Sequence, residues 1–233
     1  MRQSATTLAP ELAQDELSHL LDFLKKEKFK GRHLEIGTAA GGTLAQMMSC
    51  YPPGQRPQFV VVDTMEYFPN QYDLIRKNLE KHGCDPGQVE FRIGKSSQAF
   101  PVAERSKEEY DFVFIDGSHR LKHVMEDLRW ARLLRPGGGL VLHDYHSDRG
   151  GVRLAAERFL RKNASYQRIV LVNRLLFIRK LRSAAVREID GWDLVFANLL
   201  SPLLRLQRSM RKRFGSGGSR ERKGPASDVA GGA

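Results

Sequence analysis

Cysteine is scarce in this chain of 233 residues, which contains only Cys50 and Cys84. This pair matches no metal-binding or redox spacing, and a single disulfide bond would be too little to stabilise a domain of this size. We therefore expect inert thiols and a cytoplasmic location. Long apolar runs are missing as well. No segment approaches ~18 apolar residues, and no apolar stretch precedes a small-residue cleavage site near the amino terminus. We therefore expect a protein that is neither secreted nor membrane-spanning.

Acidic residues are outnumbered, and the imbalance is local. The 38 Lys and Arg residues against 27 Asp and Glu residues leave a formal charge of +11. Up to Ile178 the chain has 26 basic and 22 acidic residues, whereas the last 55 residues have 12 and 5. A basic excess favours an anionic partner, so we expect any such partner near the carboxyl-terminal segment.

The length suits one domain with an appendage. Apolar residues at helical spacing predict a helix over 10–29, after which short apolar runs alternate with helical segments. The predicted strands are His33–Ile36, Phe59–Asp63, Val89–Ile93, Tyr110–Asp116, Gly139–His143, Arg168–Val172 and Leu175–Arg179. The predicted helices between them are Thr43–Cys50, Asn70–His82, Ser96–Arg105, Leu121–Leu134 and Arg149–Lys162. Nearly continuous apolar strands such as VVV and FVFI indicate a parallel sheet covered on both faces.

The last two predicted strands are separated only by Asn173 and Arg174. A parallel pair cannot be joined by two residues, so the last strand must run antiparallel to its predecessor. The predicted fold class is α/β: a doubly wound, Rossmann-like sheet of seven strands, mostly parallel with the last strand antiparallel, plus an N-terminal helix and a basic C-terminal helix.

The carboxyl-terminal segment has a different pattern. Residues 192–214 place apolar side chains at helical spacing, and Pro202 is predicted to kink or restart the helix. Five cations flank that apolar stripe: Arg205, Arg208, Arg211, Lys212 and Arg213. The composition suits an anionic membrane surface, so residues 183–214 are expected to contact the inner face of a membrane peripherally. Packing on the domain or in a homodimer remains the alternative. We divide the chain into a helical cap (1–30), the α/β domain (31–180), this basic helix (181–214) and a disordered tail (215–233).

A glycine-rich turn follows the first strand. It runs from Gly37 to Gly41, Glu35 precedes it, and Asp63 ends the second strand. A dinucleotide site needs G-x-G-x-x-G, which Ala39 breaks, and a pyrophosphate there would lie near the Glu35 carboxylate. A ligand with an ammonium and a sulfonium would instead find that carboxylate favourable. We therefore favour S-adenosylmethionine (SAM). The NAD(P)-dependent oxidoreductase alternative also lacks a Tyr-x-x-x-Lys sequence.

Carboxylates and imidazoles gather where strands four and five end, at Asp116, His119, His143 and Asp144. Adjacent strands lie ~4.8 Å apart, so these catalytic candidates can converge on one site. Methyl transfer requires alignment of the acceptor and removal of its proton. Two mechanisms stay open. In one, Asp116, Asp144 and His143 bind Mg²⁺; in the other, His119 or His143 is the general base and Asp144 orients it.

Several of these motifs together resemble one known family. The segment from Leu34 through Gly41 is similar to the E-x-G-x-x-x-G signature of class I SAM-dependent methyltransferases. Asp116-Gly117-Ser118-His119 and His143-Asp144 resemble the O-methyltransferase-like branch with Asp-Gly-x-His after strand four and His-Asp after strand five. The likeness covers roughly residues 31–180. It implies that SAM is held by Glu35, Gly37, Thr38, Ala39, Gly41, Asp63, Gly94, Lys95, Ser96 and Asp116. His143 stands where metal-dependent relatives often have an acidic residue.

The class of methyl acceptor is inferred from a motif that is absent after strand four. No Asn/Asp-Pro-Pro-aromatic loop follows strand four, and the one Pro-Pro pair, Pro52-Pro53, follows the first helix of the domain. Base methylation and a nucleic-acid partner are therefore disfavoured, and a hydroxyl on a small molecule or a glycan fits better. We expect the N-terminal helix and the loop 65–68 to border the acceptor. A non-catalytic SAM-binding or membrane-tethered scaffold is the remaining alternative.

Overall fold

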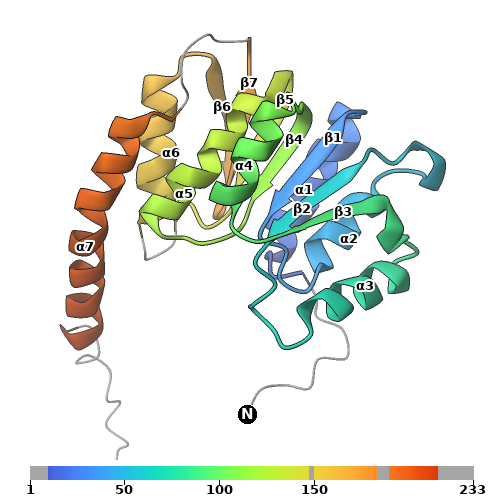
Figure 1. Ribbon diagram of the computed structural model, residues 1–233, viewed down its shortest axis with the longest axis horizontal. Helices are drawn as coiled ribbons and strands as arrows, with labels where there is room; N and C mark the ends of the chain where they lie inside the picture. Colours follow the sequence, from blue (N-terminus) through green and yellow to red (C-terminus); the bar gives the residue numbers. More distant parts are fainter. Residues whose placement is uncertain (1–9, 147–149, 183–188, 215–233) are drawn as a thin grey trace, which may run out of the picture.

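A computed structural model describes residues 10–146, 150–182 and 189–214 (Figure 1). Its centre is a seven-stranded sheet with the strand order β3-β2-β1-β4-β5-β7-β6. The strands are β1 (Arg32–Ile36), β2 (Phe59–Asp63), β3 (Val89–Ile93), β4 (Tyr110–Ile115), β5 (Leu134–Leu142), β6 (Tyr166–Val172) and β7 (Leu175–Lys180). The first five are parallel, and β7 is antiparallel to both β5 and β6. The predicted fold class is confirmed.

Helices cover both faces of the sheet. They are α1 (Gln14–Glu27), α2 (Gly42–Ser49), α3 (Gln71–Lys81), α4 (Ser96–Arg105), α5 (Leu121–Asp127), α6 (Gly151–Lys162) and α7 (Gly191–Phe214). Alternate residues of each strand point to opposite faces. Val60 and Val62 pack with α4 to α7, whereas Phe59 and Val61 pack with α1 to α3. This two-sided burial explains why the strands read as continuous apolar runs.

Two predicted elements differ from the structure. The helix expected over 121–134 ends as α5 at Asp127, and Leu128–Leu133 winds as a 3₁₀ helix that buries Trp130 and Ala131. Strand β5 begins at Leu134 rather than at Gly139, because Leu134 already pairs with Tyr110 before a register shift. Gly138 lies inside this stretch, where a Cβ would come within 2.9 Å of two backbone carbonyl oxygens.

Helix α7 lies against the domain and runs through Pro202 (Figure 1). Of the two outcomes predicted for Pro202, a restart of the helix is therefore wrong, and a kink stays a prediction. The Ser201 hydroxyl donates to the Ala197 carbonyl oxygen at 2.6 Å and supplies a hydrogen bond in the proline-containing turn. Ala197, Leu200 and Leu204 pack in the core cluster that includes α5 and α6. The side chains of Arg208 and of residues 211–214, and the predicted tail at 215–233, lie outside the described residues.

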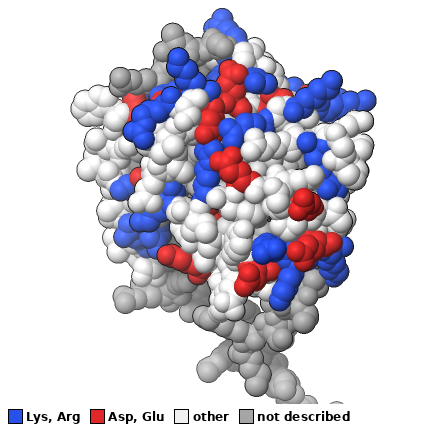
Figure 2. Space-filling view, turned by 45° about the vertical axis from the view of Figure 1, so that its right-hand side comes forward, with Lys and Arg blue, Asp and Glu red and all other residues white. Residues whose placement is uncertain are grey.

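The other side of α7 is apolar and exposed. Its large side chains are 45–76% exposed and recur at helical spacing: Trp192, Val195, Leu199, Leu203, Leu206 and Met210. No described helix combines the length and apolar character needed to cross a membrane. On the face that Figure 2 shows, basic and acidic side chains are interspersed.

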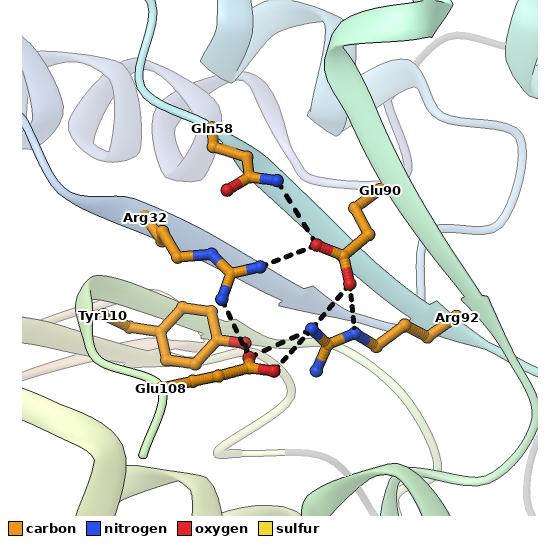
Figure 3. A network of polar contacts seen from close by, with 6 residues as sticks. All are labelled: Arg32, Gln58, Glu90, Arg92, Glu108 and Tyr110. Carbon is orange, nitrogen blue, oxygen red and sulfur yellow. Dashed lines mark hydrogen bonds and ion pairs between the residues drawn. The ribbon is translucent and has the colours of Figure 1, made fainter. Parts of the chain in front are cut away.

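A polar network joins the amino end of β1 and the segment before β4 to two residues of β3 (Figure 3). Arg32 on β1 pairs with Glu90 on β3 at 2.6 Å and with Glu108, just before β4, at 3.0 Å. Arg92 donates to both oxygens of Glu108 at 2.8 and 3.0 Å. Burial by itself would raise the pKa of Glu108, but the hydrogen bonds from Arg92 and Tyr110 lower it. The charges at this end are thus paired with one another, and the candidate site lies at the opposite, carboxyl ends.

Candidate active site

The glycine loop, residues 37–41, needs glycine at both ends. Gly37 has φ +82°, and a Cβ there would lie 2.6 Å from the Cα of Gly117. Gly41 has φ +77°, and a Cβ there would lie 2.9 Å from a methyl carbon of Ile75. Side chains at these positions would combine a strained backbone with a collision. The glycines let the loop lie directly against the segment after β4.

Two buried polar atoms beside this loop have no protein partner. Glu35 is 1% exposed and its Oε2 accepts no hydrogen bond, and the Oγ1 of Thr38 is likewise buried and unbonded. Burial raises the pKa of the Glu35 carboxyl to about 8; the nearby Thr38 side chain opposes this rise, and the charges of Asp116 and Asp63 act in the same direction as burial. Unsatisfied groups of this kind are costly in a folded protein, and a cationic ligand would satisfy both.

Asp63 joins the ends of the first three strands. Its Oδ2 accepts from the backbone N–H of Thr38 at 2.9 Å, and its Oδ1 accepts from Met65 N–H at 2.7 Å and the Gln71 amide at 3.1 Å. Its backbone carbonyl accepts from Gly94 N–H at 2.9 Å. The carboxylate is thereby held at the glycine loop, and one lone pair, on Oδ2, stays free to accept a further hydrogen bond.

The remaining residues predicted near the cofactor lie after β3. Gly94 has φ +140° and Lys95 is exposed. The Ser96 hydroxyl donates to the buried Asp127 carboxylate, so it is already engaged within the protein. Ser96 is thus bound within the protein through Asp127, whereas the side chain of Lys95 is open to solvent.

The four predicted catalytic side chains lie together; we call them the reacting cluster. His143 Nδ1 lies 2.8 Å from Asp116 Oδ1, and His119 Nδ1 lies 2.6 Å from Asp144 Oδ2. The two pairs meet where His119 Nε2 comes within 4.0 Å of Asp116 Oδ1. Asp144 has φ +59°, an uncommon backbone conformation that aspartate tolerates and that turns its side chain back toward His119.

The two histidines have different surroundings. The hydrogen bond from His119 lowers the pKa of Asp144 to about 2, with the charges of His119, His143 and Arg174 adding to the effect. An ionised carboxylate only accepts, so Nδ1 of His119 carries a proton and the neutral ring has its lone pair on Nε2. Burial disfavours protonation of His143, but its bond to Asp116 and the charges of Asp116, Asp144 and Glu16 raise its pKa. His143 faces a carboxylate at each ring nitrogen, Asp116 at 2.8 Å and Glu16 at 3.4 Å, whereas His119 contacts Asp144 through Nδ1 and its Nε2 lies 4.0 Å from Asp116.

Two further residues complete the cluster and were not predicted from the sequence. Glu16 of α1 is fully buried, and its Oε2 lies 3.4 Å from His143 Nε2 while its Oε1 accepts from Arg174 N–H at 2.9 Å. The Arg174 guanidinium donates to Asp144 Oδ1 at 2.8 Å. Each left a signal in the sequence. Glu16 stands four residues before Leu20, on the apolar stripe of its helix, and Arg174 occupies a hairpin turn that the topology places at the carboxyl end of β5.

A third such residue, Glu11, precedes α1. Burial raises the pKa of its carboxyl, and so do the charges of Asp116 and Asp144, which the histidines oppose. Glu11 itself is exposed, so it lies at the surface of the protein within the electrostatic influence of the reacting cluster. Tyr67 of the loop 65–68 is 65% exposed.

The reacting cluster is a poor fit to a divalent cation. Mg²⁺ demands near-octahedral oxygen ligands. Here both Asp144 oxygens face N–H donors, from His119 and Arg174, and Asp116 Oδ1 faces the His143 ring. Within the described ranges, no three His, Cys, Asp or Glu side chains form a group that could hold a metal ion. This donor set fits a proton-transfer network better than a cation.

Comparison with known proteins identifies the domain. Residues 34–145, which span the glycine loop and the reacting cluster, match a family model described as a methyltransferase domain. This part of the chain is therefore similar to a methyltransferase domain, in agreement with the family that its motifs resemble. The match favours the predicted methyltransferase over the oxidoreductase alternative.

Relatives agree with this assignment. A Mycolicibacterium vanbaalenii protein named "Putative O-methyltransferase" is 27% identical over 143 residues, which is 61% of this chain and 59% of that protein. The chain thus spans about three-fifths of the length of the curated relatives it matches.

Solved structures share the fold of this domain. The O-methyltransferase from Bacillus cereus, in complex with S-adenosylhomocysteine (SAH), is 19% identical, with a TM-score of 0.60 and coverage of 76% of this chain and 86% of that one. The SAM complex of TomG from Streptomyces achromogenes, involved in tomaymycin synthesis, is 19% identical, with a TM-score of 0.59 and coverage of 73% and 81%.

Proposed function

We propose that this protein transfers a methyl group from SAM to a hydroxyl of a small molecule or saccharide, with His119 as general base. The observation that carries the proposal is the 2.6 Å contact between His119 Nδ1 and Asp144 Oδ2, which orients a ring whose Nε2 has no hydrogen-bond partner among the described residues. The methyltransferase match and the O-methyltransferase relatives support the cofactor and the reaction class.

The glycine loop and its neighbours fit SAM. Its ammonium group would neutralise Glu35, whose buried Oε2 has no partner, and Thr38 would supply a hydroxyl beside it. Asp63 offers the carboxylate that ribose hydroxyls require, and the edge at Gly94 and Lys95 would border the adenine. When bound, SAM supplies a methyl group carried on a sulfonium. As the methyl group moves to the acceptor, the electrons of the S–C bond stay on sulfur.

The chain's own contribution is proton transfer and electrostatics. As the acceptor oxygen forms its bond to the methyl carbon, His119 Nε2 takes the hydroxyl proton. The resulting imidazolium is stabilised by Asp144, which is ionised at neutral pH and held in place by Arg174. Asp116, bonded to His143, presents a second carboxylate 4.0 Å from the same nitrogen.

Cation activation through Asp116, Asp144 and His143 remains the alternative predicted from the sequence. The present contacts of these side chains favour the histidine route, because a cation would have to replace the N–H donors that Asp144 now accepts. Removal of divalent cations distinguishes the two routes.

Asp144→Asn should lower the rate constant for methyl transfer by at least about 10²-fold. Asparagine tolerates the positive φ of this position but removes the charge that stabilises protonated His119. Isothermal titration with SAH should give the wild-type affinity, because Asp144 is not among the residues expected to hold the cofactor. Undiminished methyl transfer by Asp144→Asn would overturn the assignment of Asp144. If both the wild type and the variant bind SAH but neither methylates any acceptor, the protein is the non-catalytic scaffold.

We also propose that the exposed stripe of α7 contacts an anionic membrane surface. The stripe contains Trp192, Leu199 and Leu203, which are 60–76% exposed. The sequence from 194 to 214 has five basic residues and no acidic one. An apolar helix face next to cations is the arrangement that inserts into an interface between water and anionic lipid.

Vesicle co-sedimentation tests this contact. The full chain should bind phosphatidylglycerol vesicles and not phosphatidylcholine vesicles, and Leu199→Asp with Leu203→Asp should reduce binding at least 10-fold. The matched control, Gln207→Asp with Gln88→Asp, adds the same charge to exposed positions outside the stripe, one of them on α7, and should retain most binding. An equal loss of vesicle binding in both double variants would show that net charge alone causes the loss, and it would contradict insertion of the apolar stripe. A stripe that instead makes a homodimer would appear in size-exclusion chromatography as a dimer that Leu199→Asp dissociates.

A further inference from the structure

A cavity of about 480 Å³ opens beside the reacting cluster, between the start of α5 and one side of α7. His119 lines it from the domain, and Ser201 and Arg205 line it from α7. This volume lies in the range of small-molecule sites. The side of α7 that lines the cavity includes the core-packed Leu204 and lies apart from the exposed apolar stripe of the helix. The proposed general base, His119, and residues of α7 therefore line the same cavity from opposite walls.

The lining of this cavity is cationic. Arg120 and Lys122 stand on one wall and Arg205 on the other, and no carboxylate is among the described residues that line it. Nor, within the described ranges, does any of these three cations lie within 4.0 Å of an acidic side chain. Elsewhere in the structure arginines are mostly paired, as Arg32 and Arg92 are in the network of Figure 3.

The electrostatics of His123, which also lines the cavity, agree with this picture. Burial lowers the pKa of His123, and the positive charges of Arg120, Lys122 and Lys95 lower it further, against the opposing charge of Glu126. Cations on converging walls with no partner of their own are arranged for an anionic ligand, and Arg and Lys are the side chains that bind phosphate groups best.

We propose that this cavity binds a phosphate or diphosphate group of the methyl acceptor and thereby places the acceptor hydroxyl at His119. The inference rests on the proposed methyl transfer and adds the class of acceptor: a phosphorylated small molecule or saccharide. Arg120, Lys122 and Arg205 hold the anionic group, and binding energy gained there positions the distant hydroxyl. Arg205 is then the residue through which the basic carboxyl-terminal helix takes part in substrate recognition.

Calorimetric titration of the full chain, saturated with SAH, with inorganic pyrophosphate tests the proposal. We expect saturable binding that weakens at least 10-fold in Lys122→Glu with Arg205→Glu. The control, Arg76→Glu with Lys77→Glu, makes the same charge change on exposed positions of α3 and should leave pyrophosphate binding within twofold. No binding to the wild type, or equal weakening in both double variants, would overturn the proposal. Absence of SAH binding would instead contradict the proposed function, so the two failures are distinguishable.

A second titration separates the two sources of such a group. Dihexanoyl phosphatidic acid, below its micellar concentration, carries the same phosphate chemistry on a lipid. Binding at least 10-fold tighter than that of pyrophosphate, lost in Lys122→Glu with Arg205→Glu, would support a lipid-borne acceptor phosphate. Comparable affinities would support a water-soluble phosphate ester. Failure of both probes to compete for one site would contradict a shared phosphate site.

Discussion

Replacement of His119 by alanine should lower kcat for methyl transfer by about 10²- to 10⁴-fold, the usual contribution of a general base. The ring is oriented by Asp144 at 2.6 Å, and no other imidazole of the cluster combines such an orienting contact with an accessible second nitrogen. His119 is 22% exposed at the side chain, so its removal leaves no large core cavity, and SAH affinity should stay within about twofold.

Two comparisons separate catalysis from structure in this variant. Added imidazole should restore part of the lost rate to His119→Ala, because a diffusible base can replace a missing ring but cannot repair a misfolded site. His82→Ala, which removes an exposed imidazole at the end of α3, should keep the wild-type rate. A rate loss in His119→Ala that imidazole does not touch, accompanied by weakened SAH binding, would assign this residue a structural role.

Glu35→Gln should weaken SAH binding 10- to 100-fold while making the ligand-free protein more stable. The first effect follows because glutamine keeps the shape but loses the charge that pairs with an ammonium group, an interaction of about 1.5–3 kcal/mol. The second follows from burial, which raises the pKa of Glu35 to about 8 from its ordinary value of 4.5. Above that pH the ligand-free wild type keeps an unpartnered charge in its interior.

The contribution of Glu35 to the stability of the ligand-free protein falls as the pH rises. Because the folded pKa of Glu35 lies above the unfolded value, the stability it contributes is complete below about pH 4.5 and is lost as the pH rises through about 8. The difference in melting temperature between Glu35→Gln and wild type should therefore be near zero at pH 4.5 and reach several °C by pH 8.5. SAH binding to the wild type below pH 8 should release a proton. Glu109→Gln, at an exposed carboxylate, is the control and should change none of these quantities. A constant difference across this pH range would contradict the assigned role of Glu35.

Much of this architecture could be predicted from the sequence because it depends on local signals. The apolar runs fix the strands, and the two residues between β6 and β7 fix the antiparallel ending, which the structure confirms. The strand ends then bring Asp116, His119, His143 and Asp144 together, since parallel neighbours end on the same edge.

What could not be predicted depends on distant packing. Glu16 reaches His143 only because α1 lies across the sheet, and Arg174 reaches Asp144 only because β7 inserts between β5 and β6. The cavity at His119 has a similar origin. Its second wall is α7, whose position is decided by core contacts of Ala197, Leu200 and Leu204. A helical pattern reveals a buried stripe, but it does not say which surface the stripe covers.

The most direct test of the mechanism is transfer of a labelled methyl group from SAM to a panel of phosphorylated and unphosphorylated sugar and phenol acceptors, in the presence of EDTA. We predict that a hydroxyl of at least one acceptor becomes methylated at a rate that EDTA does not change and that His119→Ala reduces at least 10²-fold. Transfer that EDTA abolishes and Mg²⁺ restores, or full transfer by His119→Ala, would contradict the assignment of His119 as the general base.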